Sequence, residues 1–346
     1  MSPIGDNKIF FINFALFISL IFISNCKSMN NYFQINGNAE GTTYSIIYND
    51  KKGRYLKTEV DALLSRIEKS LSVYDNDSLI SRINRNEDVI VDDYFSDVFH
   101  RAKEIYRKTN GTFDVSAEPL FKAWGFSYSE REVMDDAKVN ELKGLIGMDK
   151  IWIDNYRVVK SNPNIVLNMN SIAKGYSVDM IARYLENEGI YNYLVEIGGE
   201  IRLRGVNKNA DKWTIGIDKP VYGNHTPGRN ILAYLRLTDK AIATSGEYRR
   251  FYIDENGNKL SHTIDPRTGY PIKHNLRSVT VIANDAISAD AYATAFMVMG
   301  MEESLKFVDE SPNLESLFIY EEDILKVRYT ANFKNHILKK DDDFER

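Results

Sequence analysis

Apolar residues recur at helical spacing in two early segments of the chain. Residues 58–73 carry Val60, Leu63, Leu64, Ile67 and Leu71, and residues 95–106 carry Phe95, Val98, Phe99, Ala102, Ile105 and Tyr106. This spacing puts each set on one face and predicts two amphipathic helices whose apolar faces enter the core. Asn110-Gly111 ends the second helix.

Short runs rich in β-branched and aromatic residues predict strands. Two further helices are predicted, one from Ser171 as its N-cap to about Glu188, and one from about Ser288. The elements mix without a regular strand–helix alternation, so the pattern predicts an α+β fold rather than a doubly wound sheet. The predicted strands cover residues 41–48, 165–167, 193–196, 213–217, 231–237, 278–283 and 317–320.

The N-terminus has the layout of a signal peptide. Lys8 precedes an apolar run over residues 10–23, which is shorter than the about 20 residues that a membrane crossing needs. The residues that follow, up to Cys26, resemble a lipobox. We therefore expect residues 1–25 to be a lipoprotein signal peptide and Cys26, the single cysteine, to be lipidated. An ordinary signal peptide beside an unmodified cysteine is the alternative.

The rest of the chain divides simply. Residues 26–34 form a polar tether, residues 35–335 one folded domain, and residues 336–346 a charged tail that we expect to fray from Lys339. The net charge is −5 with both signs interspersed, so a nucleic-acid partner is not expected.

Three segments carry residues suited to chemistry. In residues 168–176, a helix start with Lys174 and Gly175 favours an anion, although a solvated lysine at a plain junction is equally compatible. In the rigid turn of residues 261–271, His262 and Asp265 have a spacing at which a carboxylate orients an imidazole base, although lone histidines are more often structural.

The third segment, residues 288–295, begins a helix. Asp290 and Thr294 are four residues apart and face one side, which suits Mg²⁺. On spacing alone, a purely structural role for both is favoured. The sequence contains no G-x-G-x-x-G fingerprint, P-loop, H-E-x-x-H or G-x-S-x-G motif.

Taken together, these segments resemble the ApbE family of flavin transferases, from Gly41 to about Gly300. The family has an α+β fold of mixed sheets and packed helices, with two lobes around a central cleft for FAD and Mg²⁺. The motifs occur in order at Tyr74 and residues 77–84, 111–114, 119–120, 124–126, 168–176, 196–200, 261–269 and 290–294.

The resemblance implies roles for individual residues. Mg²⁺ is expected on the Ser171 backbone carbonyl, Asp290 and Thr294, and His262 is expected to be the base, oriented by Asp265. Ala293 stands where many relatives have a second aspartate, so one metal ion is expected. Asn168 stands where many have aspartate, which makes the pocket less negative. The residues expected to bind FAD are Tyr74, Thr112, Phe113, Asp114, Asn168, Lys174 and Ile264.

The implied activity is transfer of the FMN half of FAD to a threonine or serine hydroxyl of an acceptor protein, with release of AMP. The acceptor carries a motif resembling Asp-x-x-Ser/Thr-Gly-Ala/Ser-Thr, and an extracytoplasmic redox-pump subunit is the expected partner. Residues 244–247 do not complete that motif, so self-modification is not expected. The expected location is the periplasmic face of the inner membrane. FAD hydrolysis to FMN and AMP, and FAD binding without catalysis, remain alternatives.

Overall fold

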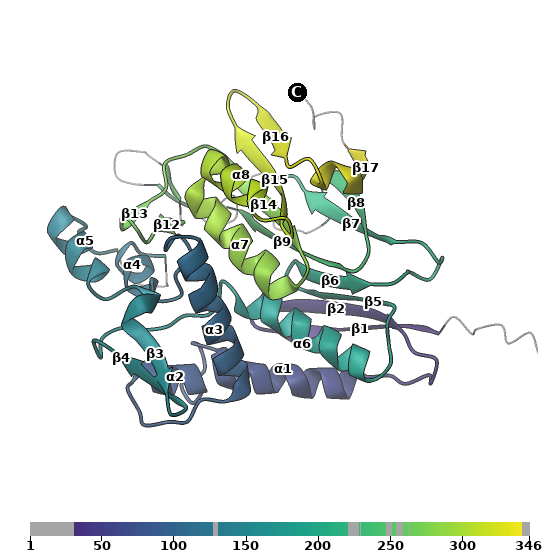
Figure 1. Ribbon diagram of the computed structural model, residues 1–346, viewed down its shortest axis with the longest axis horizontal. Helices are drawn as coiled ribbons and strands as arrows, with labels where there is room; N and C mark the ends of the chain where they lie inside the picture. The colour runs from purple at the N-terminus through teal and green to yellow at the C-terminus, as the bar shows by residue number, and fades with distance from the viewer. Residues whose placement is uncertain are drawn as a thin grey trace, which may run out of the picture.

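The computed structural model describes residues 31–126, 131–220, 228, 230–246, 251–253, 259–261 and 263–340. Its centre is an antiparallel sheet of eight strands in the order β1-β2-β5-β6-β9-β14-β15-β16 (Figure 1). The strands are β1 (Tyr32–Ala39), β2 (Thr42–Asn49), β5 (Tyr193–Ile197), β6 (Glu200–Arg204), β9 (Lys240–Gly246), β14 (Leu276–Ala283), β15 (Glu315–Glu321) and β16 (Leu325–Tyr329).

Alternating side chains of this sheet enter two different cores. Phe318 of β15 joins the main core on the helical side, whereas its neighbours Leu317 and Ile319 join a second core on the other side. This is the two-residue period of a strand that is buried on both faces. A three-stranded sheet in the order β17-β8-β7 supplies the rest of the second core, and its strands are β7 (Trp213–Asp218), β8 (Ile231–Leu237) and β17 (Ile337–Lys340).

Helices cover the other face of the large sheet. α6 and α7 lie across it in Figure 1, and α7 is buried around nearly its whole circumference. The helices are α1 (Lys57–Leu71), α2 (Leu79–Asn84), α3 (Asp93–Lys108), α4 (Glu118–Ala123), α5 (Asp136–Lys143), α6 (Ala173–Asn187), α7 (Ala286–Met299) and α8 (Met301–Asp309), with short 3-10 helices at Met148–Lys150 and Phe333–His336.

A smaller lobe extends from the helical side. α4 and α5 enclose a third core that contains Leu120, Trp124 and Leu142 and also receives Ile264 from a distant turn. The Trp124 indole N–H donates to the Gly269 carbonyl at 2.9 Å and ties this turn to the lobe. The remaining strands form three hairpins: β3 (Ile151–Asp154) with β4 (Arg157–Lys160), β10 (Phe251–Ile253) with β11 (Lys259–Ser261), and β12 (Ile264–Asp265) with β13 (Tyr270–Pro271).

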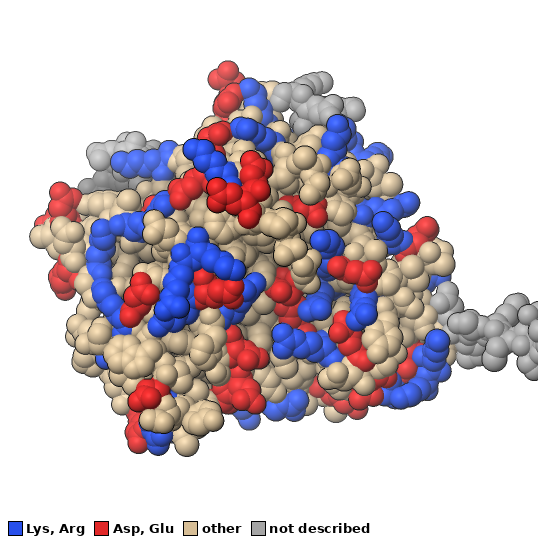
Figure 2. Space-filling model, in the orientation of Figure 1, with Lys and Arg blue, Asp and Glu red and all other residues tan. Residues whose placement is uncertain are grey.

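The α+β class is confirmed, as are the two amphipathic helices, which are α1 and α3. Two predictions about the strands and the C-terminal tail are wrong. Residues 165–167 form no strand, and Lys339 and Lys340 are not frayed, because β17 pairs with β8 there. The predicted signal peptide and Cys26 lie outside the described residues. Acidic and basic side chains intermingle on the face drawn in Figure 2.

Candidate active site

A cavity of about 720 Å³ lies where the smaller lobe meets the ends of α6 and α7. Pockets of about 300 to 1,000 Å³ are typical for organic ligands. Every residue expected from the sequence to bind FAD or metal lines this cavity, whereas Asp265, expected to orient the base, does not. The lining thus includes Tyr74, Thr112, Phe113, Asp114, Asn168, Ser171, Lys174, Ile264, Asp290 and Thr294. Segments far apart in sequence are brought together there.

The segment that enters α6 has no strand partner, and a side-chain amide serves instead. Asn84, the last residue of α2, donates from Nδ2 to the Leu167 carbonyl and accepts from the Leu167 N–H, both at 2.8 Å. Burial of the apolar run is therefore achieved without sheet pairing, which explains the wrong strand prediction. Ser171 is also not the N-cap: Ile172 takes that position and no side chain caps the helix.

Instead, α6 and α7 satisfy each other's first amides. The Gly175 N–H of α6 donates to Asp290 Oδ2 of α7 at 3.0 Å. In return, Asp179 of α6 accepts from the Ala286 and Ile287 N–H groups of α7, each at 2.9 Å. The two helices approach so closely that a Cβ on Gly175 would lie 2.4 Å from the Ala286 oxygen. This contact fixes Asp290 at the cavity.

Charged groups gather at this end of the cavity. Lys174 Nζ lies 2.6 Å from Glu200 Oε1, and among the described residues no hydrogen-bond partner reaches Glu200 Oε2. Burial alone would lower the pKa of the Lys174 ammonium, but Glu200, Asp290 and Glu40 outweigh it and raise that pKa. Burial, followed by the charge of Glu200, raises the pKa of Asp290 to about 8.

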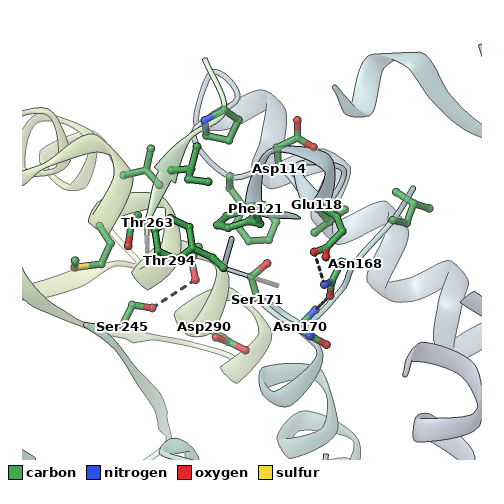
Figure 3. A pocket seen from close by; sticks show the side chains of 18 of the residues that line it. Asp114, Glu118, Phe121, Asn168, Asn170, Ser171, Ser245, Thr263, Asp290 and Thr294 are labelled. Carbon is green, nitrogen blue, oxygen red and sulfur yellow. Dashed lines mark hydrogen bonds between the residues drawn. The ribbon is translucent and has the colours of Figure 1, made fainter. Parts of the chain in front are cut away.

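A divalent cation fits this end. Buried Asp290 carries a carboxylate whose charge is disfavoured, and a bound cation reverses that effect. Thr294 lies one turn further along the same face of α7, and its Oγ1 is 3.4 Å from Ser245 Oγ (Figure 3). Hard oxygen donors suit Mg²⁺. The described residues contain no group of three or more His, Cys, Asp and Glu arranged around a metal, so a cation here would be held by mixed oxygen donors.

The segment after α3 supplies another carboxylate, that of half-buried Asp114. Asp114 Oδ1 accepts from the Ser116 N–H at 2.8 Å and from the Ser116 hydroxyl at 2.6 Å. Burial nevertheless raises the pKa of Asp114 to about 6. The Thr112 hydroxyl donates to the Thr109 carbonyl at 3.1 Å, so it stabilises the end of α3 while the residue lines the cavity.

A chain of hydrogen bonds forms the opposite wall, as Figure 3 shows in part. Asn168 Nδ2 donates to Glu118 Oε2 at 2.8 Å, and Asn168 Oδ1 accepts from the Asn170 N–H at 3.0 Å. Asn170 Nδ2 then donates to the Tyr74 hydroxyl at 3.0 Å. The Tyr74 side chain is 72% exposed and stands at the edge of the cavity, where it is available to a ligand.

Ion pairs stabilise the turn that follows the expected base in the sequence. The Asp265 carboxylate accepts from the Arg267 N–H at 2.8 Å and from the Arg267 guanidinium, which also reaches Glu303 of α8 at 2.9 Å. Thr263 and Ile264 face the cavity from this turn. His262 lies outside the described residues, and the orientation of His262 by Asp265 stays a prediction.

Several residues at the site were not singled out from the sequence. Glu118, Ser245 and Asn84 have no chemical motif of their own, although Glu118 directly precedes Pro119-Leu120 and Asn84 ends the segment of residues 77–84. For Glu118 and Asn84, this position beside or within a motif segment was the available signal, and Ser245 had none of this kind. Glu40 gave none, because its burial arises only from the β1–β2 turn folding against α6, where it accepts from the Ser177 hydroxyl.

A family model decides the relationship. The ApbE family model matches residues 41–318. The chain belongs to the ApbE family. An FAD:protein FMN transferase of Vibrio cholerae is 34% identical over 330 residues, which cover 93% of this chain and 97% of that protein. One from Haemophilus influenzae is 35% identical, over 86% of this chain and 89% of that protein.

Solved ApbE structures share the fold. The flavin transferase ApbE from Vibrio cholerae superposes with a TM-score of 0.77 at 34% identity, covering 88% of this chain and 99% of that one. The apo form of the Pseudomonas stutzeri flavinyl transferase ApbE gives a TM-score of 0.79 at 30% identity, covering 90% and 98%. Among the described residues, no helix is both long and apolar enough to span a bilayer.

Proposed function

We propose that this protein is a Mg²⁺-dependent FAD:protein FMN transferase, which joins FMN to a threonine or serine hydroxyl of an acceptor protein and releases AMP. One observation carries the proposal: a single cavity joins the oxygen-rich end at Ser171, Asp290 and Thr294 to the polar wall at Asn168 and Tyr74. A dinucleotide needs both a site for its diphosphate and a site for a ring system. The names of the matched relatives support this reading.

The Ser171 carbonyl, Asp290 and Thr294 would hold Mg²⁺, which when bound neutralises diphosphate charge and favours departure of the leaving phosphate. Lys174 adds a fixed positive charge beside them, oriented by its 2.6 Å pair with Glu200. These groups orient the diphosphate and stabilise charge that develops on the leaving group, which are the main contributions in phosphoryl transfer.

His262 is the proposed base. It would take the proton of the acceptor hydroxyl as that oxygen attacks the phosphorus nearer riboflavin. The new bond is a phosphoester between acceptor and FMN, and the bond that breaks is the one between this phosphorus and the oxygen retained by AMP. Asp265 and Arg267 stabilise the turn that follows His262 in the sequence, from which Thr263 and Ile264 line the cavity.

The N-terminal pattern supports an extracytoplasmic location. We propose that lipidated Cys26 anchors the enzyme at the periplasmic face of the inner membrane and that residues 1–25 are removed. An acceptor with the Asp-x-x-Ser/Thr-Gly-Ala/Ser-Thr motif, such as an extracytoplasmic redox-pump subunit, would be within reach there.

The test combines the protein with FAD, Mg²⁺ and a peptide carrying the acceptor motif. Mass spectrometry should show a peptide heavier by one FMN, together with an equal amount of AMP. Asp290→Asn and His262→Ala should each lower the transfer rate by at least about 100-fold. Asp309→Asn, at the exposed end of α8, is the matched control and should keep the native rate. Free FMN with an unmodified peptide would instead identify a hydrolase, and intact FAD a binding protein.

A further inference from the structure

The carboxylate of Glu118 lines the cavity. Neither the motifs nor the proposed mechanism assigns it a role. We propose that Glu118 recognises FAD by accepting a hydrogen bond from an N–H group on one of its two ring systems, and that Asn168 sets the direction of that interaction. The inference rests on the proposed function and specifies how the substrate of that same site is selected.

The direction of the hydrogen bonds follows from Asn168. Its Oδ1 already accepts from the Asn170 N–H at 3.0 Å, so the amide cannot be reversed without placing two N–H groups against each other. Nδ2 is therefore the donor in the 2.8 Å contact, and Glu118 Oε2 is the acceptor. Figure 3 shows this pair on the side of the cavity away from Asp290.

The second carboxylate oxygen of Glu118, Oε1, is available to accept a hydrogen bond from a ligand. No described residue hydrogen-bonds with Glu118 Oε1, and the half-buried side chain lines the cavity. A carboxylate oxygen in this setting accepts from a donor. FAD offers two ring edges with an N–H, the isoalloxazine N3–H and the adenine 6-amino group. Its phosphates offer only acceptors, which Glu118 repels.

Both partners are held in place before any ligand binds. Glu118 is the first residue of α4, Pro119 restricts the backbone that follows it, and Leu120 is buried in the core of the smaller lobe. The Asn168 N–H donates to the Val115 carbonyl at 2.8 Å. A group fixed in this way selects its partner at low entropic cost.

Two variants separate recognition from structure. In Glu118→Gln, Asn168 still donates to the side-chain oxygen, so the wall is kept, but the amide N–H now faces the ligand. The variant should bind FAD about 10- to 100-fold more weakly, because donor meets donor. The lost negative charge would by itself favour anionic FAD, so weaker binding cannot be attributed to charge. A ligand hydroxyl could turn to accept from the amide, whereas a ring N–H cannot.

The double variant Glu118→Gln/Asn168→Asp reverses the pair. The aspartate introduced at position 168 can only accept, so the glutamine amide introduced at position 118 donates to it. The oxygen of that glutamine then faces the ligand again, with the native net charge restored. We expect FAD affinity to recover to within about 10-fold of the native value. Affinity is measured with Mg²⁺ by quenching of flavin fluorescence, and Glu59→Gln, on the exposed face of α1, serves as control.

Two analogues identify which ring donates. One is FAD methylated at N3, and the other carries unsubstituted purine in place of adenine, so that the 6-amino group is replaced by hydrogen. The analogue that lacks the recognised N–H should bind the native protein weakly and lose no further affinity in Glu118→Gln. The proposal is overturned if Glu118→Gln binds FAD like the native protein, if the double variant is as weak as the single one, or if both analogues are weakened further in Glu118→Gln. Failure of FMN transfer by the native protein would instead refute the proposed function.

Discussion

The two ends of the cavity are built on different physical grounds. At the α6–α7 end, Lys174 lies with the buried side chains of Glu200 and Asp290. Burial and the charge of Glu200 raise the pKa of Asp290, and the two acidic groups raise the pKa of Lys174 despite its burial. At the opposite wall, Glu118 and Asn168 are joined mainly by the direction of hydrogen bonds between half-buried groups. The first end should tolerate substitution poorly, because the charge of each group depends on the others. The second end should distinguish ligands by whether they offer a hydrogen-bond donor or an acceptor.

This difference predicts different consequences of substitution. Removing one member of a buried charge cluster leaves another uncompensated, which typically costs about 3 to 5 kcal/mol. A neutral or singly charged hydrogen bond at a partly exposed wall contributes about 0.5 to 3 kcal/mol. Changes at the α6–α7 end should therefore affect folding and activity together, and changes at the Glu118 wall should affect ligand choice.

The largest effect is expected from separating α6 and α7. In Gly175→Ala, the new Cβ would lie 2.4 Å from the Ala286 oxygen and 2.9 Å from Asp290 Cβ, so the helices must move apart. We expect a loss of about 3 kcal/mol in the free energy of unfolding, measured with urea, and weaker activation by Mg²⁺. Ser65→Ala on the exposed face of α1 is the control. Native stability in Gly175→Ala would show that the close contact does not organise this end.

A smaller effect is expected from Glu40, which lies behind the charged end. Burial raises its pKa to about 7 from an ordinary value of 4.5. The folded state thus binds this proton more tightly than the unfolded chain does. The stabilisation of the folded state by the bound proton is complete below about pH 4.5 and is lost as the pH rises through about 7. As the pH rises from about 5 to about 8, the free energy of unfolding of Glu40→Gln should increase by about 1 to 3 kcal/mol relative to that of the native protein.

Urea unfolding at several pH values tests this, with Glu59→Gln as an exposed control on α1. A constant difference between Glu40→Gln and the native protein across that range would contradict it, because the carboxyl would then have the same pKa in both states.

The smallest effect is expected at the polar wall. Asn168→Asp places a second carboxylate against Glu118, where the native contact is 2.8 Å. We expect about 10-fold weaker FAD binding at about pH 8 and a smaller loss at about pH 5, because two adjacent carboxyls share a proton as pH falls. Fluorescence titration at both pH values measures it, with Asn164→Asp in the exposed loop as control. An equal loss at both pH values would show that Glu118 is not the group repelled.

Much of the fold follows from the local spacing of apolar residues. The faces of α1 and α3 depend on spacing alone, and the apolar run of residues 317–320 predicts a strand, so these elements could be predicted. Residues 165–167 could not, because the apolar run is compatible with a strand until Asn84 supplies the backbone with other partners. Sequence patterns do not reveal which distant amide substitutes for a strand.

The site divides in the same way. Asp290 and Thr294 share a helix face, which their spacing predicts, and the structure places both at the cavity. The pairing of Asp265 with Arg267, only two residues away, competes with any role toward the imidazole, and spacing alone could not choose between them. Glu118 was missed because its partner Asn168 is 50 residues away and only the fold brings them together.

The reciprocal amide contacts between α6 and α7 also decide when the proposed cation site would form. Gly175 and Asp290 are 115 positions apart, so an unfolded chain does not bring the α6 and α7 parts of the site together. In the proposed function, Mg²⁺ would therefore bind only after both helices have docked, in the compartment where folding is completed.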